Sequence, residues 1–171
     1  MINDGALKKI KVLAMDVDGV LTDGRIIVDS HGVESKNFDV QDGLGIVVLQ
    51  KCGIKTAFIS ARESDVVAHR AKDLNIDKVY VGVYPKLSAY ENMLKEFNVQ
   101  DAQVCFIGDD VADLGLMRRC GVGVAVANAV AEVKQIAHYV TVKKGGYGAV
   151  REVVELILKA QGHWNPQLYE C

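Results

Sequence analysis

The sequence lacks several features that would place it in a special class of protein. Two prolines among 171 residues exclude a proline-rich linker or a compositionally disordered chain. The 20 basic and 22 acidic residues nearly balance, and the lysines and arginines are scattered, so we expect no nucleic-acid-binding face. With 50% hydrophobic and 25% charged residues, the composition is that of an ordinary globular protein.

The cysteines and apolar runs exclude further classes. The four cysteines show neither C-x-x-C spacing nor a zinc pattern, and Cys52 and Cys105 lie in apolar runs, as small core residues do. No stretch approaches the length of a membrane span, and the first residues lack the apolar segment of a signal peptide. We therefore expect a soluble, cytoplasmic protein with one domain over residues 1–171 and a tail at 162–171.

Six short apolar runs alternate with segments of helical periodicity. The runs are rich in valine and isoleucine and almost continuously apolar, which is typical of strands covered on both faces. This alternation predicts an α/β fold with a mostly parallel sheet and helices on both sides. The expected strands are Ile10–Met15, Ile54–Ser60, Lys78–Gly82, Gln103–Gly108, Gly123–Ala127 and His138–Thr141.

One segment, at about residues 22–40, breaks this alternation. It contains two stretches of alternating polarity around "DSHG", a pattern that indicates a β-hairpin. Its hydrophobic content is low for a core element. We therefore expect a flap or an oligomer contact between the first strand and the first long helix.

Polar clusters follow four of the predicted strands. In an open parallel sheet, ligands bind at the carboxyl ends of the strands, so the fold would gather these clusters at one edge. They comprise Asp16 and Asp18 after the first strand, Ser60 to Arg62 after the second, Lys86 after the third, and Gly108 to Asp113 after the fourth.

The residue types in these clusters suit phosphoryl transfer. One carboxylate of the Asp16 and Asp18 pair can attack phosphorus, and the other can move the proton of the leaving oxygen. Asp109 together with Asp16 offers the carboxylate oxygens that Mg²⁺ requires. Ser60 can hold phosphate oxygens, and Lys86 can balance the negative charge.

Each cluster also has a simpler explanation. Asp-x-Asp-Gly opens some calcium-binding loops, but Leu21 and Ile27 stand where such a loop needs glycine and glutamate. An acidic turn, a helix cap at Ser60 or Asp110, and a solvated surface lysine at Lys86 are alternatives for each cluster alone. The occurrence of all four in order favours a joint functional role.

The four clusters resemble, in order, the motifs of the haloacid dehalogenase superfamily of phosphatases: "DVDGVLTDG", "ISAR", "YPK" and "GDDVAD". The resemblance implies a Rossmann-like three-layer core without a separate cap domain, because no segment between the motifs is long enough for one. It implies catalytic roles for Asp16, Asp18, Ser60 and Lys86, with Asp16 the nucleophile and Asp18 the general acid and base. It also implies Mg²⁺ ligands (Asp16, the Asp18 carbonyl, Asp109) and a supporting residue, Asp113.

Within that superfamily, the chain is most similar to the capless 3-deoxy-D-manno-octulosonate 8-phosphate phosphatases, which form tetramers through such hairpins. The similarity implies Mg²⁺-dependent hydrolysis of that sugar phosphate in lipopolysaccharide precursor biosynthesis. It implies a homotetramer, with neither nucleic acid nor membrane as a partner. The implied substrate-binding residues are Asp18, Asp39, Val40, Gln41, Asp42, Gly43, Arg62, Arg70 and Lys86.

Some positions depart from the group or distinguish its members. Val47 stands where some members have arginine, and Ala61 where glycine is common. Arg62 favours the eight-carbon substrate, because related nine-carbon sugar phosphatases tend to have glutamate there. In this family the tail of one subunit can reach the next subunit's site, so residues Trp164 to Tyr169 are a candidate lid.

Two alternatives stay open. The same chemistry could act on a nine-carbon ulosonate 9-phosphate or another phosphomonoester. A phospho-accepting receiver domain is also an α/β protein with acidic residues, a hydroxyl residue and a lysine. Receivers, however, have a lone acceptor aspartate at the third strand, whereas here the candidate is at the first strand with Asp18 beside it.

Overall fold

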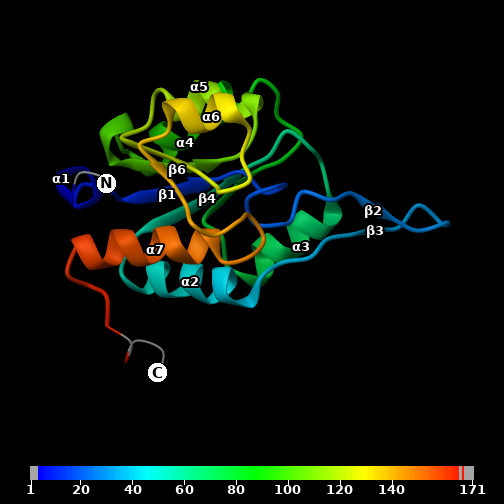
Figure 1. Cartoon of the computed structure of the whole chain (residues 1–171), viewed down its shortest axis with the longest axis horizontal. Coiled ribbons are helices and arrows are strands. Elements are labelled where there is room, and N and C mark those ends of the chain that lie inside the picture. Colours follow the sequence, from blue (N-terminus) through cyan, green and yellow to red (C-terminus); the bar gives the residue numbers. More distant parts are fainter. Residues whose placement is uncertain (1–3, 166, 168–171) are drawn as a thin grey trace.

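Short strands and helices alternate along residues 4–165 and 167, which are the residues that the computed structural model describes (Figure 1). The strands are β1 (Val12–Met15), β2 (Ile27–Val28), β3 (Glu34–Ser35), β4 (Lys55–Ile59), β5 (Lys78–Tyr80), β6 (Val104–Gly108), β7 (Val122–Ala125) and β8 (Tyr139–Val140). The helices are α1 (Asp4–Leu7), α2 (Val40–Lys51), α3 (Asp65–Asp73), α4 (Leu87–Phe97), α5 (Leu114–Met117), α6 (Ala131–Ile136) and α7 (Ala149–Ala160). Two 3₁₀ turns are η1 (Asp101–Gln103) and η2 (Val111–Asp113).

Six of these strands form one parallel sheet in the order β5-β4-β1-β6-β7-β8. Val12 of β1 pairs with Lys55 on one side and Val104 on the other, so β1 lies between β4 and β6. All four residues of β1 are buried, as the continuous apolar run predicted. The α/β fold class and the mostly parallel sheet are confirmed, with one strand in each of the six expected runs.

Helices cover both faces of the sheet, which gives the predicted three layers (Figure 1). Helices α2, α3 and α7 lie on one side, and α2 packs along α7. Helices α4, α5 and α6 lie on the other side. The strand order reverses between β1 and β6, which is the position where open α/β sheets bind ligands.

The predicted hairpin is present, with β2 and β3 as two antiparallel strands of two residues each. Figure 1 shows it extending away from the sheet and the helices. The hairpin segment exposes the apolar side chains of Ile26, just before β2, and of Val28 and Val33. In the described part of the chain, no helix is both long and apolar enough to cross a membrane.

The chain after α7 turns back onto its own helix. The Trp164 ring lies 5.2 Å from the Arg151 guanidinium carbon and 5.3 Å from Lys159 Nζ, and its backbone N–H donates to the Leu158 carbonyl. Residues 166, 168 and 169 of the candidate lid lie outside the described residues. Within this chain, Trp164 therefore packs on α7.

Candidate active site

The four predicted clusters meet at the carboxyl end of the sheet, in a cavity of about 280 Å³. Asp16 and Asp18 follow β1, Ser60 follows β4, and Asp109 follows β6. Lys86 is the residue that precedes α4. The residues lining the cavity are Asp16, Asp18, Gly24, Ile26, Ser60, Ala61, Arg62, Lys86, Asp109, Asp110 and Ala112.

Lys86 lies between two carboxylates and is almost completely buried. Its Nζ is 2.9 Å from Asp16 Oδ2 and 2.7 Å from Asp113 Oδ1. Burial alone would lower the pKa of Lys86, but the charges of Asp16 and Asp113 outweigh it and raise that pKa. Lys86 is therefore a fixed positive charge directly beside the predicted nucleophile.

Asp16 and Asp109 have the raised pKa values expected of carboxylates crowded together. Burial and the charge of Asp113 raise the pKa of Asp16 to about 6, although Lys86 opposes the shift. Burial and the charges of Asp16 and Asp113 raise the pKa of Asp109 to about 8. Such strongly shifted, coupled groups in a cavity are typical of functional sites.

The acidic groups offer a fitting site for a divalent cation. One oxygen each from Asp16, Asp109 and Asp113 lies within 4.8 Å of the others. Asp109 Oδ1 is buried and accepts no hydrogen bond from the residues that the structure describes. Asp113 is already engaged, because it accepts from Lys86 through Oδ1 and from the Asp109 N–H through Oδ2. Asp16 and Asp109 are thus the better placed carboxylates for a hard cation such as Mg²⁺.

Gly19 and two later glycines permit the close approach of backbones around this site. Gly19 has a φ of +90°, and a Cβ there would lie 2.0 Å from Asp109 Oδ2. A Cβ on Gly145 would lie 1.7 Å from the Gly19 carbonyl oxygen. Gly146, at φ +71°, donates its N–H to the Val20 carbonyl. The loop before α7 therefore packs directly on the loop that presents Asp16 and Asp18.

Two further residues of the first and fourth motifs have local roles in turns. Asp23 Oδ1 accepts from the Arg25 N–H, as in the turn into the hairpin that the sequence predicts. Asp110 is the N-cap of η2, and its side chain accepts from the Val111 N–H. Asp110 thus has the capping role that the sequence analysis gave as its alternative explanation.

The hairpin contributes two charged residues that the sequence analysis missed. The side chain of Lys36 is completely buried, with its Nζ 2.5 Å from Asp18 Oδ1 and 3.2 Å from Glu34 Oε1. Glu34 also accepts from Arg62 Nη2 at 3.0 Å and from the Ser64 hydroxyl. Nothing in the polar segment that contains Lys36 distinguishes it from an exposed flap, so no local pattern signals this contact.

Several predicted substrate-binding residues do not line the cavity. Asp39 caps α2 by accepting from the Gln41 N–H, and Val40 is 80% exposed. Arg70 pairs with Asp73 and lies 5.5 Å over the Phe38 ring. Gln41 is exposed and Gly43 is buried within α2. The contact of all these residues with a substrate stays a prediction.

Asp42 requires a correction within this chain. It is fully buried rather than presented to a ligand, and it accepts hydrogen bonds from the backbone N–H groups of Gly148 and Arg151. Its carboxylate thus caps the start of α7, more than a hundred residues along the chain. Burial raises the pKa of Asp42 to about 6, against the effect of these hydrogen bonds. Val47, the departure in α2, packs against the core.

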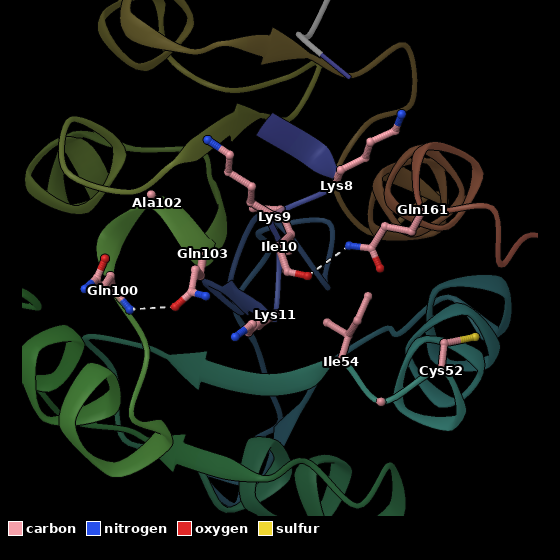
Figure 2. A pocket seen from close by; sticks show the side chains of 11 residues that line it. Lys8, Lys9, Ile10, Lys11, Cys52, Ile54, Gln100, Ala102, Gln103 and Gln161 are labelled. Atoms are coloured by element: carbon pink, nitrogen blue, oxygen red, sulfur yellow. Dashed lines mark hydrogen bonds between the residues drawn. The ribbon is translucent and has the colours of Figure 1, made fainter. Parts of the chain in front are cut away.

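A larger cavity, of about 640 Å³, lies at the amino end of the sheet (Figure 2). Gln161 Nε2 donates there to the Leu7 and Ile10 carbonyls. No aspartate or glutamate is among its lining residues, so it offers neither a nucleophilic carboxylate nor a metal ligand set. The residues that line this cavity are Lys8, Lys9, Ile10, Lys11, Cys52, Gly53, Ile54, Gln100, Ala102, Gln103 and Gln161.

Comparison with known proteins identifies the family of this chain. Residues 84–153 match the family of haloacid dehalogenase-like hydrolases. The chain is 45% identical over 152 residues to the 3-deoxy-D-manno-octulosonate 8-phosphate phosphatase of Yersinia pestis, covering 89% of this chain and 81% of that protein. It is 41% identical over 156 residues to that of Haemophilus influenzae, covering 91% and 87% respectively.

Solved structures give the same result. A crystal structure of 3-deoxy-D-manno-octulosonate 8-phosphate phosphatase from Moraxella catarrhalis, in complex with a magnesium ion, a phosphate ion and a KDO molecule, matches with a TM-score of 0.91 and 45% identity. The match covers 93% of this chain and 91% of that one. The chain therefore belongs to the haloacid dehalogenase-like hydrolases, in the group of the 3-deoxy-D-manno-octulosonate 8-phosphate phosphatases.

Proposed function

We propose that this protein is a Mg²⁺-dependent phosphatase that hydrolyses 3-deoxy-D-manno-octulosonate 8-phosphate to the free sugar acid and phosphate, in lipopolysaccharide precursor biosynthesis. The main support is the buried arrangement of Asp16, Lys86 and Asp109 at the carboxyl end of the sheet. This arrangement occurs in a chain that is 41–45% identical to two 3-deoxy-D-manno-octulosonate 8-phosphate phosphatases.

In the first half of the reaction, the Asp16 carboxylate attacks phosphorus and the bond from phosphorus to the sugar oxygen breaks. Asp18, protonated at this stage, gives its proton to the departing sugar oxygen. In the second half, Asp18 takes a proton from a water molecule, whose oxygen attacks phosphorus and breaks the bond to Asp16. Phosphate leaves, and both aspartates return to their starting state.

The remaining residues hold charge in place. Lys86, fixed by Asp113, would stabilise negative charge on the transferring phosphoryl group, and Ser60 would hold one of its oxygens. Asp16, Asp109 and the Asp18 carbonyl would hold Mg²⁺, which when bound supplies positive charge to the phosphate and carboxylates. Asp109 Oδ1, buried without a hydrogen bond from a described residue, is the observation that supports this assignment.

Substrate choice would depend on the cavity's cationic rim. Arg62 lines the cavity, and its guanidinium suits the bidentate recognition of a sugar carboxylate. Arg70, Asp39, Val40 and Gln41 lie outside the cavity, so they would contact a substrate that is bound in a neighbouring subunit's site. A nine-carbon ulosonate 9-phosphate is the alternative substrate.

We also propose a homotetramer assembled through the hairpins, in the cytoplasm. The exposed apolar side chains of Ile26, Val28 and Val33 on the hairpin support a subunit contact there. Cys52, Cys105 and Cys120 are free thiols, which suits a reducing compartment. Light scattering of the purified protein would measure the assembly, and a monomer would contradict it.

A phosphate-release assay over a panel of phosphomonoesters tests the proposed function. With Mg²⁺ present, we expect the eight-carbon sugar phosphate to have the highest kcat/KM, ahead of the nine-carbon ulosonate 9-phosphate and simple phosphomonoesters. Arg62→Glu is the matched variant, and it should lose preference for the eight-carbon acid. Equal kcat/KM across the panel would overturn the substrate assignment.

A further inference from the structure

The hairpin places a buried amine against one of the two aspartates of the first motif. The Lys36 side chain has no exposed surface, and its Nζ lies 2.5 Å from Asp18 Oδ1. A lysine that is charged and shielded from water is stable only when carboxylates compensate it. Lys36 has two such partners, Asp18 and Glu34.

Glu34, the second partner, is itself held in place. It accepts from the Ser64 hydroxyl through Oε2, and from Arg62 Nη2 at 3.0 Å through Oε1. Both donors belong to the segment between β4 and α3, so the contact joins the hairpin to the rim of the cavity. Lys36 is therefore anchored from one side, and Asp18 is the group that it fixes on the other.

The contact makes the two oxygens of Asp18 unequal. Oδ1 accepts from Lys36, whereas Oδ2 is buried and accepts no hydrogen bond from the described residues. Arg62 Nη1 is 3.9 Å from Oδ2, beyond hydrogen-bond distance. A carboxylate held at one oxygen cannot rotate about its Cβ–Cγ bond without breaking that contact. Oδ2 is thus the oxygen without a hydrogen-bond partner among the described residues, and the contact of Oδ1 with Lys36 fixes the orientation of the whole carboxyl group.

We propose that Lys36 is a positioning residue, which fixes the orientation of the Asp18 carboxyl group for its exchange of a proton with the sugar oxygen. The inference rests on the proposed function, because it concerns the acid–base step of that reaction. The proton passes from the Asp18 carboxyl group to the departing oxygen as that oxygen separates from phosphorus. Lys36 stays charged and exchanges no proton.

A comparison of leaving groups tests this role. In Lys36→Met, we expect kcat/KM for 3-deoxy-D-manno-octulosonate 8-phosphate to fall about tenfold to a hundredfold, because the sugar oxygen is a poor leaving group unless it receives a proton. For p-nitrophenyl phosphate, whose phenolate leaves without one, the fall should stay within about threefold. Lys55→Met is the matched control, because Lys55 pairs with Asp77 at 2.7 Å on the surface. Its kcat/KM for both substrates should equal that of the wild type.

A double-mutant cycle separates an effect through Asp18 from a general structural one. In the Asp18→Asn background, Lys36→Met should cost less than about threefold on the sugar phosphate, because the group it positions no longer carries a proton. Lys36→Arg should recover part of the single variant's loss. If Lys36→Met is unstable, Glu34→Gln is the second variant. It should lower kcat/KM for the sugar phosphate more than for p-nitrophenyl phosphate, by a smaller factor than Lys36→Met does.

Three results would overturn the inference. They are an equal fall on both substrates, a rise in KM with kcat unchanged, and a full additive cost in the Asp18→Asn background. A wild-type protein that hydrolyses neither phosphomonoester with Mg²⁺ would instead refute the proposed function. The two failures are therefore distinguishable.

Discussion

The two ends of the parallel sheet differ in whether their charged side chains are buried or exposed. At the carboxyl end, Asp16, Lys86 and Asp113 are buried against one another around a cavity of about 280 Å³. At the amino end, a cavity of about 640 Å³ is surrounded by lysines that stay exposed. The larger cavity is not the candidate site, because buried, coupled charges and not volume indicate chemistry.

The direction of the helices offers a reason why the lysines and the proposed phosphate site lie at opposite ends of the sheet. Helices that follow strands of a parallel sheet begin at its carboxyl end and finish at its amino end. Their dipoles favour anions at their beginnings and cations at their ends. The proposed phosphate site at the carboxyl end of the sheet and Lys8, Lys9 and Lys11 at the amino end both agree with this preference.

The largest expected difference between the two ends concerns the nucleophile. Asp16→Asn should lower the rate of phosphate release about 10⁴-fold or more, because an amide cannot form the covalent intermediate. Lys9→Ala, at the amino end, should leave kcat/KM unchanged. Steady-state assays with Mg²⁺ measure both, and substantial turnover by the Asp16 variant would refute the assigned mechanism.

The second largest effect concerns stability. Lys86→Met leaves Asp16 and Asp113 buried without their shared cation, so we expect the free energy of unfolding at pH 7 to fall by about 3–5 kcal/mol. Lys9→Met removes only an exposed charge and should change it by less than about 0.5 kcal/mol. Urea unfolding of both variants tests this contrast, which similar losses would contradict.

A third effect is confined to the carboxyl end and depends on pH. Asp16 and Asp109, with pKa values near 6 and 8 in the metal-free protein, must lose protons before they hold Mg²⁺. Affinity for Mg²⁺ should therefore rise about tenfold or more between pH 6 and pH 8. Titration calorimetry in two buffers of different ionisation enthalpy would detect the released protons.

The raised pKa values of Asp16 and Asp109 also determine whether the stability of the fold rises or falls with pH. A carboxyl group whose pKa is raised by folding stabilises the folded state in its protonated form, so stability falls as pH rises through that pKa. The metal-free protein should lose stability between about pH 4 and pH 8, and Mg²⁺ should reverse the loss at the upper end. An affinity for Mg²⁺ that is equal at pH 6 and pH 8 would contradict both expectations.

The smallest effect belongs to the amino end. Gln161→Leu removes the two hydrogen bonds to the Leu7 and Ile10 carbonyls, at 3.0 and 2.9 Å. We expect a loss of about 1 kcal/mol in the free energy of unfolding, with kcat/KM unchanged. Thermal unfolding and the phosphate assay together test this, and a lowered kcat/KM would show that the two ends are coupled.

The parts of the fold that follow from local pattern were predictable. Strands β1, β6 and β7 lie in continuous apolar runs, because strands covered on both faces bury every side chain. The edge strands β5 and β8 leave side chains partly exposed, and the alternation along the chain located them. Asp16, Ser60, Lys86 and Asp109 also follow from sequence, since topology brings the carboxyl ends of parallel strands together.

Contacts between distant segments were not predictable in the same way. The surroundings of Lys36 are polar, and only the path of the hairpin buries its side chain against Asp18. Asp42 lies in a motif associated with substrate, yet it caps a helix that begins at Ala149. Neither contact has a periodicity or a spacing that a sequence would display.

The glycines at 145 and 146 have a consequence for how this protein tolerates mutation. Neither contributes a side chain to the cavity, yet any Cβ there would collide with the backbone of residues 19–23. In a scan of all single substitutions, we expect this loop to be as intolerant as the aspartates themselves. A search for functional residues that relies on intolerance to substitution alone would therefore select this loop. Its glycines, however, only allow the backbone of residues 19–23 to approach closely.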